Sequence, residues 1–136
     1  MARLWRLTVR SDFAAAHALR HYQGKCEALH GHNFFVEATV QGSKLTGDTE
    51  LLMDFKEIKS LLKTVLDKLD HKDLNQIPEF SSRNPSSENL AAFIYAELAG
   101  LLSAYPDVRL HSVTVSEKSA QSATYLEFDG PGEGAE

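Results

Sequence analysis

The sequence predicts one α+β domain in which an antiparallel sheet of four strands carries two helices on one face. Two segments of alternating hydrophobicity open the chain, two segments with helical periodicity follow, and two further strand-like segments come last. Strands that are neighbours along the chain pair antiparallel, and a sheet with one apolar face needs helices to cover that face. The expected order is therefore strand, strand, helix, helix, strand, strand.

The strands are expected at residues 4–10, 33–41, 108–116 and 123–128. In the first, Trp5, Leu7 and Val9 alternate with charged or polar residues, which is the pattern of a half-buried strand. The second strand alternates in the same way, and the sequence GSKLTGD after it predicts a turn or loop. The link EKSAQS between the last two strands suits a hairpin or a longer loop.

Each expected helix has an apolar stripe at spacings of three and four residues. The stripes consist of Phe55, Ile58, Leu61, Leu62, Val65 and Leu69 in the first helix and of Leu90, Phe93, Ile94, Leu98 and Leu101 in the second. Asp54 followed by Glu57 predicts a capped start for the first helix. Ser86 or Ser87 is expected to cap the second helix, with Pro85 fixing the approach of the chain.

The length and the net charge of the chain limit the kinds of protein that it can be. The 136 residues suffice for one domain with one core, expected over residues 1–129, and the Gly-rich acidic residues 130–136 are expected to form a flexible tail. The net charge is −5 without a block of Lys or Arg, so neither a nucleic acid nor a membrane is an expected partner. The N-terminal segment lacks the apolar stretch of a signal peptide, which favours a cytoplasmic protein.

Three histidines indicate a candidate metal site. His30 and His32 lie two residues apart on a strand, so their side chains project from one face, and Gly31 leaves room for close backbone approach. His17, just past the first strand and after the small residues of FAAA, is the best candidate for a third ligand. Three imidazoles leave a fourth position open, as in catalytic zinc sites. The alternative is two exposed histidines on a strand edge.

Four further residues are candidates for chemistry, each with a plainer alternative. Cys26 is a small buried side chain, a fourth zinc ligand or an activated thiol; as the only cysteine, it excludes an internal disulfide. Asp70 orients the imidazole of His71 at the end of the first helix, or His71 simply interacts with the helix dipole. Glu117 shares a face with apolar strand residues and needs a partner, or it lies in water beyond the strand.

Six motifs, taken in order, resemble a known enzyme family. They are FAAAH, CEALHGHNF, MDFKEIK, LDHKDLN, NPSSENLA and VSEKSAQSATY. Over nearly its whole length the chain is similar to the 6-pyruvoyltetrahydropterin synthase / 6-carboxytetrahydropterin synthase family. The resemblance implies the tunnelling fold (T-fold), in which a four-stranded antiparallel sheet with two helices on one side assembles as a trimer, and then a hexamer, around a barrel.

The resemblance also implies residue roles. The implied zinc ligands are His17, His30 and His32, and the implied catalytic residues are Cys26, Asp70 and His71. The implied pterin-binding residues are Glu117, whose carboxylate suits two parallel hydrogen bonds from the ring, and Ser86, Ser87 and Glu88. At Ser86, Ser87 and Glu88 the chain reads SSE where the family commonly has TTE or TSE. After Glu117 it also departs from the family's common E-x-P-T.

The spacing C-x-x-x-H-G-H resembles the bacterial 6-carboxytetrahydropterin synthases of the queuosine pathway more than the biopterin-forming synthases, which commonly have a longer gap. The implied reaction is zinc-dependent conversion of 7,8-dihydroneopterin triphosphate to 6-carboxy-5,6,7,8-tetrahydropterin, acetaldehyde and triphosphate. The alternative is elimination of triphosphate to a 6-pyruvoyl product. The candidate cations for the triphosphate are Lys25, Arg10, Lys118 and Arg20.

Two functions from other classes are also consistent with the residues. A cysteine hydrolase would use Cys26, His71 and Asp70 without a metal, and it would keep its activity in the presence of chelators. A non-catalytic zinc-bound assembly module would bind metal without turnover.

Overall fold

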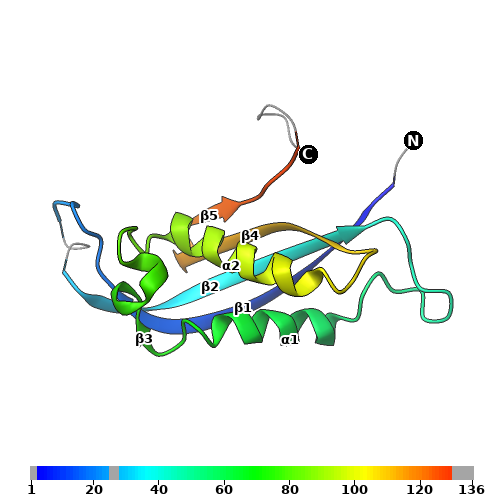
Figure 1. Ribbon diagram of the computed structural model, residues 1–136, viewed down its shortest axis with the longest axis horizontal. Helices are drawn as coiled ribbons and strands as arrows, with labels where there is room; N and C mark the ends of the chain where they lie inside the picture. The colour runs from blue at the N-terminus through cyan, green and yellow to red at the C-terminus, as the bar shows by residue number, and fades with distance from the viewer. Residues whose placement is uncertain (1–2, 25–27, 130–136) are drawn as a thin grey trace.

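The computed structural model describes residues 3–24 and 28–129, so the expected tail at 130–136 lies outside the described residues. The elements in chain order are β1 (Trp5–His17), β2 (His30–Gly42), α1 (Phe55–Leu66), β3 (Lys72–Asp73), the 3-10 helices η2 (Leu74–Gln76) and η3 (Pro78–Phe80), α2 (Ser87–Leu102), β4 (Arg109–Lys118) and β5 (Gln121–Tyr125). Both α-helices lie on the same face of one sheet (Figure 1). The expected α+β class is confirmed.

The sheet has five strands in the order β3-β1-β2-β4-β5. The four long strands pair antiparallel, whereas β3 runs parallel to β1 and pairs Lys72 with Ala15 and Asp73 with Ala16. The expectation of a purely antiparallel sheet of four strands is therefore wrong in this one element. A strand of two residues is too short to show the alternation by which strands are recognised in a sequence.

The first two strands are longer than the sequence predicts. β1 and β2 each span 13 residues. They pair without a break from Trp5–Gly42 to His17–His30. The expected strands stopped short because FAAAH and HGHN carry small or polar residues at positions where a half-buried strand would alternate. His17 is consequently the last residue of β1 rather than a residue beyond it.

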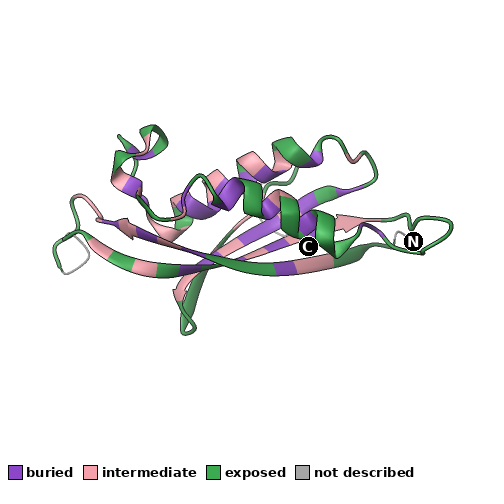
Figure 2. Cartoon of the chain, turned by 90° about the horizontal axis from the view of Figure 1, so that it is seen from below, coloured by how far each residue is buried: buried purple, intermediate pink, exposed green. Residues whose placement is uncertain are grey.

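The core lies between the helices and the covered face of the sheet (Figure 2). Alternate residues from Phe34 to Val40 in β2 face this layer, as do Val9, Phe13 and Ala15 of β1 and Val113 and Val115 of β4. Among the side chains that are almost fully buried in the core are Val9, Phe13, Phe34, Val36, Ile58, Leu62, Leu90, Ile94 and Leu98. Side chains that continue the same alternation toward the end of the sheet therefore also point to the helix side.

Both expected helix caps are confirmed. The carboxylate of Asp54 accepts a hydrogen bond from the backbone N–H of Lys56, and the hydroxyl of Ser86 accepts one from that of Asn89. The apolar stripes differ in two positions, because Phe55 is 51% exposed and Leu101 is 36% exposed. Leu66 and Leu102 are buried near the ends of the two helices instead.

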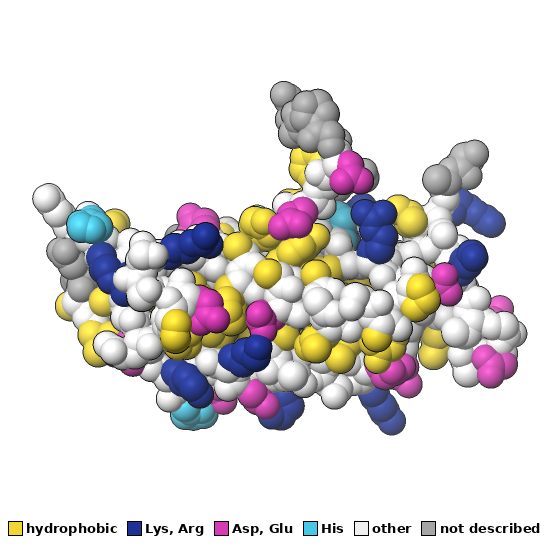
Figure 3. Space-filling view, viewed as in Figure 1, with side chains coloured by type: hydrophobic (Ala, Val, Ile, Leu, Met, Phe, Trp, Pro, Cys, Tyr) yellow, Lys and Arg dark blue, Asp and Glu magenta, His cyan; other side chains and the backbone are white. Residues whose placement is uncertain are grey.

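The C-terminal strands form a tight hairpin, with two residues between the end of β4 at Lys118 and the start of β5 at Gln121. On the helix-bearing side of the molecule, acidic and basic side chains are interspersed (Figure 3). Within the described part of the chain, no helix has the length and apolar character needed to cross a bilayer.

Candidate metal centre

The three candidate histidines come together where β1 ends and β2 begins. His17 and His30 are direct partners across the β1–β2 ladder, and Ala15 faces His32 in the same register. All three follow the alternation of the buried positions, so their side chains point to the helix side of the sheet. The local pattern of FAAAH and HGHNF thus places three imidazoles at one end of the core.

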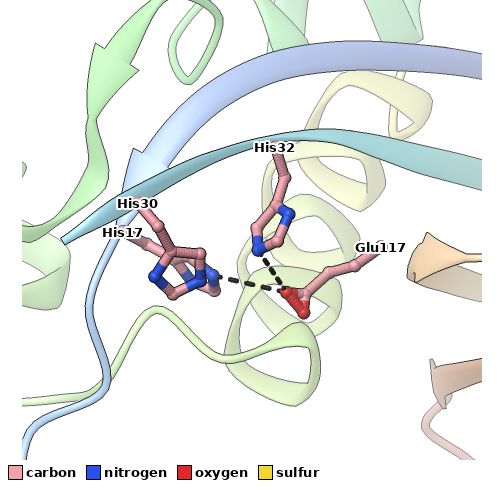
Figure 4. Close-up of side chains that lie close together, drawn as sticks. All are labelled: His17, His30, His32 and Glu117. Carbon is pink, nitrogen blue, oxygen red and sulfur yellow. Dashed lines mark ion pairs between the residues drawn. The ribbon is translucent and has the colours of Figure 1, made fainter. Parts of the chain in front are cut away.

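The imidazole rings and one carboxylate converge on a common point (Figure 4). The ring centroids of His17, His30 and His32 are 4.5 to 5.3 Å apart. One ligating atom from each histidine and one oxygen of Glu117 all lie within 4.8 Å of one another. Glu117 reaches the group from β4, where it continues the face of the buried valines. Imidazole nitrogens with a carboxylate oxygen are a donor set that zinc accepts.

Main-chain carbonyls orient two of the rings. The Nδ1 atom of His17 lies 2.7 Å from the carbonyl oxygen of Pro85, and the Nδ1 atom of His30 lies 2.6 Å from that of Ala28. A carbonyl only accepts, so Nδ1 carries the proton in both rings. Each Nε2 therefore presents its lone pair to the centre of the group, which is the arrangement of a metal-binding histidine.

Two of the ring nitrogens at the centre are buried without a hydrogen-bond partner among the described residues, namely Nε2 of His17 and Nε2 of His32. The Glu117 oxygen Oε1 lies 3.4 Å from the first and 3.0 Å from the second without forming a hydrogen bond of good geometry. Buried polar atoms without partners are rare and costly in folded proteins. A metal ion at this point would satisfy them, so the residues fit one.

The protonation of His32 favours ligation. Burial is the largest effect on this ring and lowers its pKa from 6.5. The carboxylate of Glu117 opposes this shift, while His30, His17 and Lys118 add to it. The lowered pKa keeps His32 neutral at physiological pH, and only a neutral imidazole can donate its lone pair to a metal.

Asp70 and His71 are in contact, but not at the end of α1 where they were expected. The helix ends at Leu66, and the pair lies in the following turn. Asp70 Oδ1 accepts a hydrogen bond from the backbone N–H of Ala14 at 2.9 Å, and Asp70 Oδ2 lies 2.9 Å from Nδ1 of His71. The backbone of His71 has φ of +60°, a left-handed conformation that is uncommon for a residue other than glycine.

This geometry gives Asp70 a lowered pKa, first because of the hydrogen bond from Ala14 and then through its contact with His71, with burial acting in the opposite direction. Asp70 therefore stays ionised and orients the imidazole. The His71 side chain is 81% exposed and is not one of the residues that converge on the metal centre. The structure thus confirms the contact within the pair but does not bring the pair into the histidine cluster.

The other expected site residues have different surroundings. Cys26 lies outside the described residues. Ser86 is the cap of α2, Ser87 is the first residue of that helix, and Glu88 is an exposed acid in its first turn. Pro85, which precedes them, supplies the carbonyl that holds His17. The segment therefore starts beside the histidine cluster, and its role in lining a pterin pocket stays a prediction.

The three described cations that were expected to meet the triphosphate divide into two groups. Arg10 pairs with Glu37 at 2.7 Å, and the Arg20 guanidinium donates to two main-chain carbonyls of the 80–83 segment at 2.7 and 3.0 Å. Lys118 is exposed at the end of β4, next to the metal centre. Lys25 lies outside the described residues. Of the described candidates, Lys118 is thus the best placed to meet an anion beside the histidines.

Sequence reasoning missed the groups that orient the ligands. The acceptors of His17 and His30 are carbonyls of Pro85 and Ala28, which any residue type supplies, so no sequence signal identifies them. The approach of Glu117 to the histidines was missed as well. Its signal was present, because Glu117 continues the apolar face of its strand toward the same end of the sheet.

Comparison with known proteins identifies the family. Residues 6–127 match the 6-pyruvoyl tetrahydropterin synthase family. The chain is 38% identical over 129 residues to 6-carboxy-5,6,7,8-tetrahydropterin synthase of Synechocystis sp., covering 90% of this chain and 94% of that relative. It is 36% identical over 110 residues to 6-pyruvoyl tetrahydrobiopterin synthase of Dictyostelium discoideum, covering 72% and 81%.

A solved structure has the same fold. The structure of Caenorhabditis elegans 6-pyruvoyl tetrahydropterin synthase matches with a TM-score of 0.81 at 24% identity, covering 93% of this chain and 98% of that one. The sequence match and the converging histidines agree with the resemblance of the six motifs. The chain therefore belongs to the 6-pyruvoyl tetrahydropterin synthase family of pterin enzymes.

Proposed function

We propose that the chain is a zinc-dependent lyase that converts 7,8-dihydroneopterin triphosphate and water to 6-carboxy-5,6,7,8-tetrahydropterin, acetaldehyde and triphosphate, as a cytoplasmic step of queuosine synthesis. The similarity to the Synechocystis enzyme of that name, over 90% of the chain, supports the reaction. The C-x-x-x-H-G-H spacing supports it as well.

One observation carries the metal part of the proposal. His17 donates its Nδ1–H to Pro85, so its buried Nε2 presents a lone pair, 3.4 Å from a Glu117 oxygen. Two electron-rich atoms that face each other in a buried place repel unless a cation or a proton lies between them. Zinc held by His17, His30 and His32 removes this repulsion, and when bound it supplies Lewis-acid chemistry that polarises side-chain oxygens of the substrate.

Glu117 holds the pterin ring. Its carboxylate accepts two parallel hydrogen bonds from the amino group and the ring N–H of a pterin, because these donors form a fork of matching width. Glu117 is 23% exposed, so a ligand can reach it. Ser86, Ser87 and Glu88 contact the ring from the start of α2. Fixing the ring in this way leaves the substrate side chain beside the histidines, where it reacts.

Proton transfer is the task of Cys26 and of His71, which Asp70 orients. The two groups act on opposite sides of the substrate side chain. Because His71 is exposed and outside the histidine cluster, a second copy of the chain supplies it to the site. The cation that meets the triphosphate is Lys118, whose position at the end of β4 places it next to Glu117.

The assembly is a ring of copies, a trimer or a dimer of trimers. Among the described residues, the outer edge of β1 is paired with β3 only at Ala15 and Ala16, and β5 forms the opposite edge of the sheet. Unpaired edges favour association, and pairing one edge with the other in head-to-tail fashion closes a ring. The exposed His71 lies beside the β1 edge and so faces the neighbouring copy.

A second candidate is the 6-pyruvoyl synthase activity, which the name of the Dictyostelium relative favours. Product analysis by mass spectrometry separates the two. Zinc-loaded protein is incubated with 7,8-dihydroneopterin triphosphate, with Cys26→Ala and His30→Ala as controls. We expect a carboxylated tetrahydropterin and acetaldehyde from the wild-type protein and neither from the variants.

Other outcomes change the proposal in defined ways. A pyruvoyl product keeps the site residues and changes the reaction. Turnover that survives a chelator and stops on thiol alkylation supports a metal-free cysteine hydrolase. Metal binding without turnover of either kind supports an assembly module.

A further inference from the structure

The ring of His17 depends on a carbonyl from a segment without regular structure. Residues 81–86 connect η3 to α2 and form neither helix nor strand. Pro85 of this segment is buried, and its carbonyl oxygen lies 2.7 Å from Nδ1 of His17. His17 itself is 2% exposed. Something must hold the segment in place, because a displaced carbonyl would leave both nitrogens of a buried ring without partners.

Asn84 makes three hydrogen bonds immediately before this carbonyl. Its side-chain Oδ1 accepts from the backbone N–H of Arg20 at 2.8 Å, and its Nδ2 donates to the backbone carbonyl of Arg20 at 2.9 Å. Its own carbonyl accepts from Nδ2 of Asn89 at 2.8 Å. A side-chain amide that both donates to and accepts from one residue reproduces a step of a β-ladder. Asn84 thus ties the Pro85 segment to the chain that leaves His17.

A second asparagine makes the same kind of contact at a different place. Asn75 in η2 accepts from the backbone N–H of Ala18 at 2.8 Å and donates to the Ala18 carbonyl at 3.0 Å. Asn75 and Asn84 are both half-buried. Asn75 therefore supports the chain directly after His17 with the same two kinds of hydrogen bond that Asn84 makes. Unlike Asn84, it does not lie in the segment that carries the Pro85 carbonyl.

We propose that Asn84 is a positioning residue of the metal centre, and that it sets the affinity for zinc by holding the Pro85 carbonyl against Nδ1 of His17. The inference rests on the metal part of the proposed function. A hydrogen bond to the outer nitrogen of a metal-binding histidine fixes its tautomer and ring orientation, and loss of such a partner weakens metal binding about 10- to 100-fold. The acceptor of the His17 hydrogen bond is the main-chain carbonyl of Pro85, which no substitution removes. Asn84 therefore acts indirectly, by fixing the position of that carbonyl.

The test compares Asn84→Ala with Asn75→Ala, since each removes one pair of side-chain bonds to the chain after His17. Zinc affinity is measured by competition with a chromophoric chelator, and the His17 Nδ1–H proton is followed by NMR in the metal-free protein. We expect Asn84→Ala to weaken zinc binding about 10- to 100-fold and to lose the protected imidazole proton. Asn75→Ala keeps the proton and loses less than about tenfold in affinity.

Equal losses in the two variants, or an unchanged affinity in Asn84→Ala, overturn the proposal, because the effect would then not pass through the Pro85 carbonyl. Asn84→Asp is a second variant, which keeps the acceptor for the Arg20 N–H and loses the donor to the Arg20 carbonyl. If Asn84→Ala does not fold, the zinc affinity of Asn84→Asp is compared with that of Asn75→Ala instead. A wild-type protein that binds no zinc overturns both the metal centre and this inference. A wild-type protein that binds zinc, with Asn84→Ala binding it equally well, overturns this inference alone.

Discussion

At the scale of single residues, the side chain with two competing roles is Glu117. Its carboxylate approaches the nitrogens of His17 and His32, which suits a metal ligand, and it is accessible enough to bind a pterin. The two roles differ in what the negative charge does. A ligand loses affinity for the metal when the charge is removed, whereas a ring anchor loses affinity for the substrate.

Glu117→Gln is therefore expected to weaken substrate binding at least about tenfold, because a hydrogen bond to a charged acceptor contributes about 1.5–3 kcal/mol. Zinc affinity should change less than substrate affinity. Isothermal titration with a non-reactive pterin and a chelator competition measure the two quantities on the same protein. A fall in zinc affinity that matches or exceeds the fall in pterin affinity would make Glu117 a ligand.

His71 is one of three described residues other than glycine that have a left-handed backbone, with φ of +60°. A left-handed backbone costs about 1–2 kcal/mol for a residue with a Cβ, and glycine avoids that cost while losing about 0.5–1 kcal/mol through its more flexible unfolded chain. We expect His71→Gly to keep or slightly raise the free energy of unfolding while abolishing turnover. Urea unfolding and steady-state kinetics measure the two.

Glu50 supplies the matched control, since it has φ of +57° and is exposed, remote in sequence from the candidate site residues. Glu50→Gly should change stability in the same direction and leave turnover unchanged. If His71→Gly kept full turnover, the Asp70–His71 pair would have no part in the reaction.

At the scale of elements, the two helix caps are chemically similar but differ in location. Asp54 caps α1 at the far end of the fold from the histidines, and Ser86 caps α2 beside Pro85. Replacing either by Ala removes one bond to an N-terminal N–H and should cost about 0.5–2 kcal/mol of stability. Only Ser86→Ala should also raise KM for the pterin, if the serine hydroxyl lines the pocket. Thermal unfolding and steady-state kinetics are measured for both variants. If Ser86→Ala and Asp54→Ala have the same KM, Ser86 does not line the pocket.

The elements also show what the sequence can predict. Alternation identified β1 and β2, and periodicity with a capping residue identified both helices, because these signals are local. β3 has two residues and no local signal; its place is fixed by the turn at His71 and by pairing with Ala15 and Ala16. The two histidines of HGH were predictable from their spacing on a strand, whereas the carbonyl acceptors of the site arise only when distant segments meet.

At the scale of the whole molecule, the proposal that two copies share each site has a direct test by mixing. His30→Ala removes one proposed metal ligand, and His71→Ala removes the imidazole of the Asp70–His71 pair, here called the relay. In a ring assembled at random from equal amounts of both, about one quarter of the sites combine an intact histidine cluster from one copy with an intact relay from the next. We expect neither variant to turn over alone and the mixture, after dissociation and reassembly, to recover about that fraction.

Recovery that is absent in a properly reassembled mixture of two inactive variants would place the cluster and the relay in the same copy, whereas turnover by His71→Ala alone would exclude the relay. The size of the assembly is measured on the same samples by light scattering. A monomer with full activity would contradict the shared site outright.

The pairing of His17 with His30 across the ladder has a consequence for how such a chain can vary. Residues 18–29 leave the sheet at one histidine and return at its direct partner, so the ends of this excursion are fixed by the strands and not by its length. Doubling the length of a flexible loop costs only about 0.6 kcal/mol in closure entropy. Insertions between Arg20, which Asn84 ties in place, and the start of β2 are therefore expected to cost little stability, because the two strands hold His17 and His30 opposite each other whatever the length of the connection.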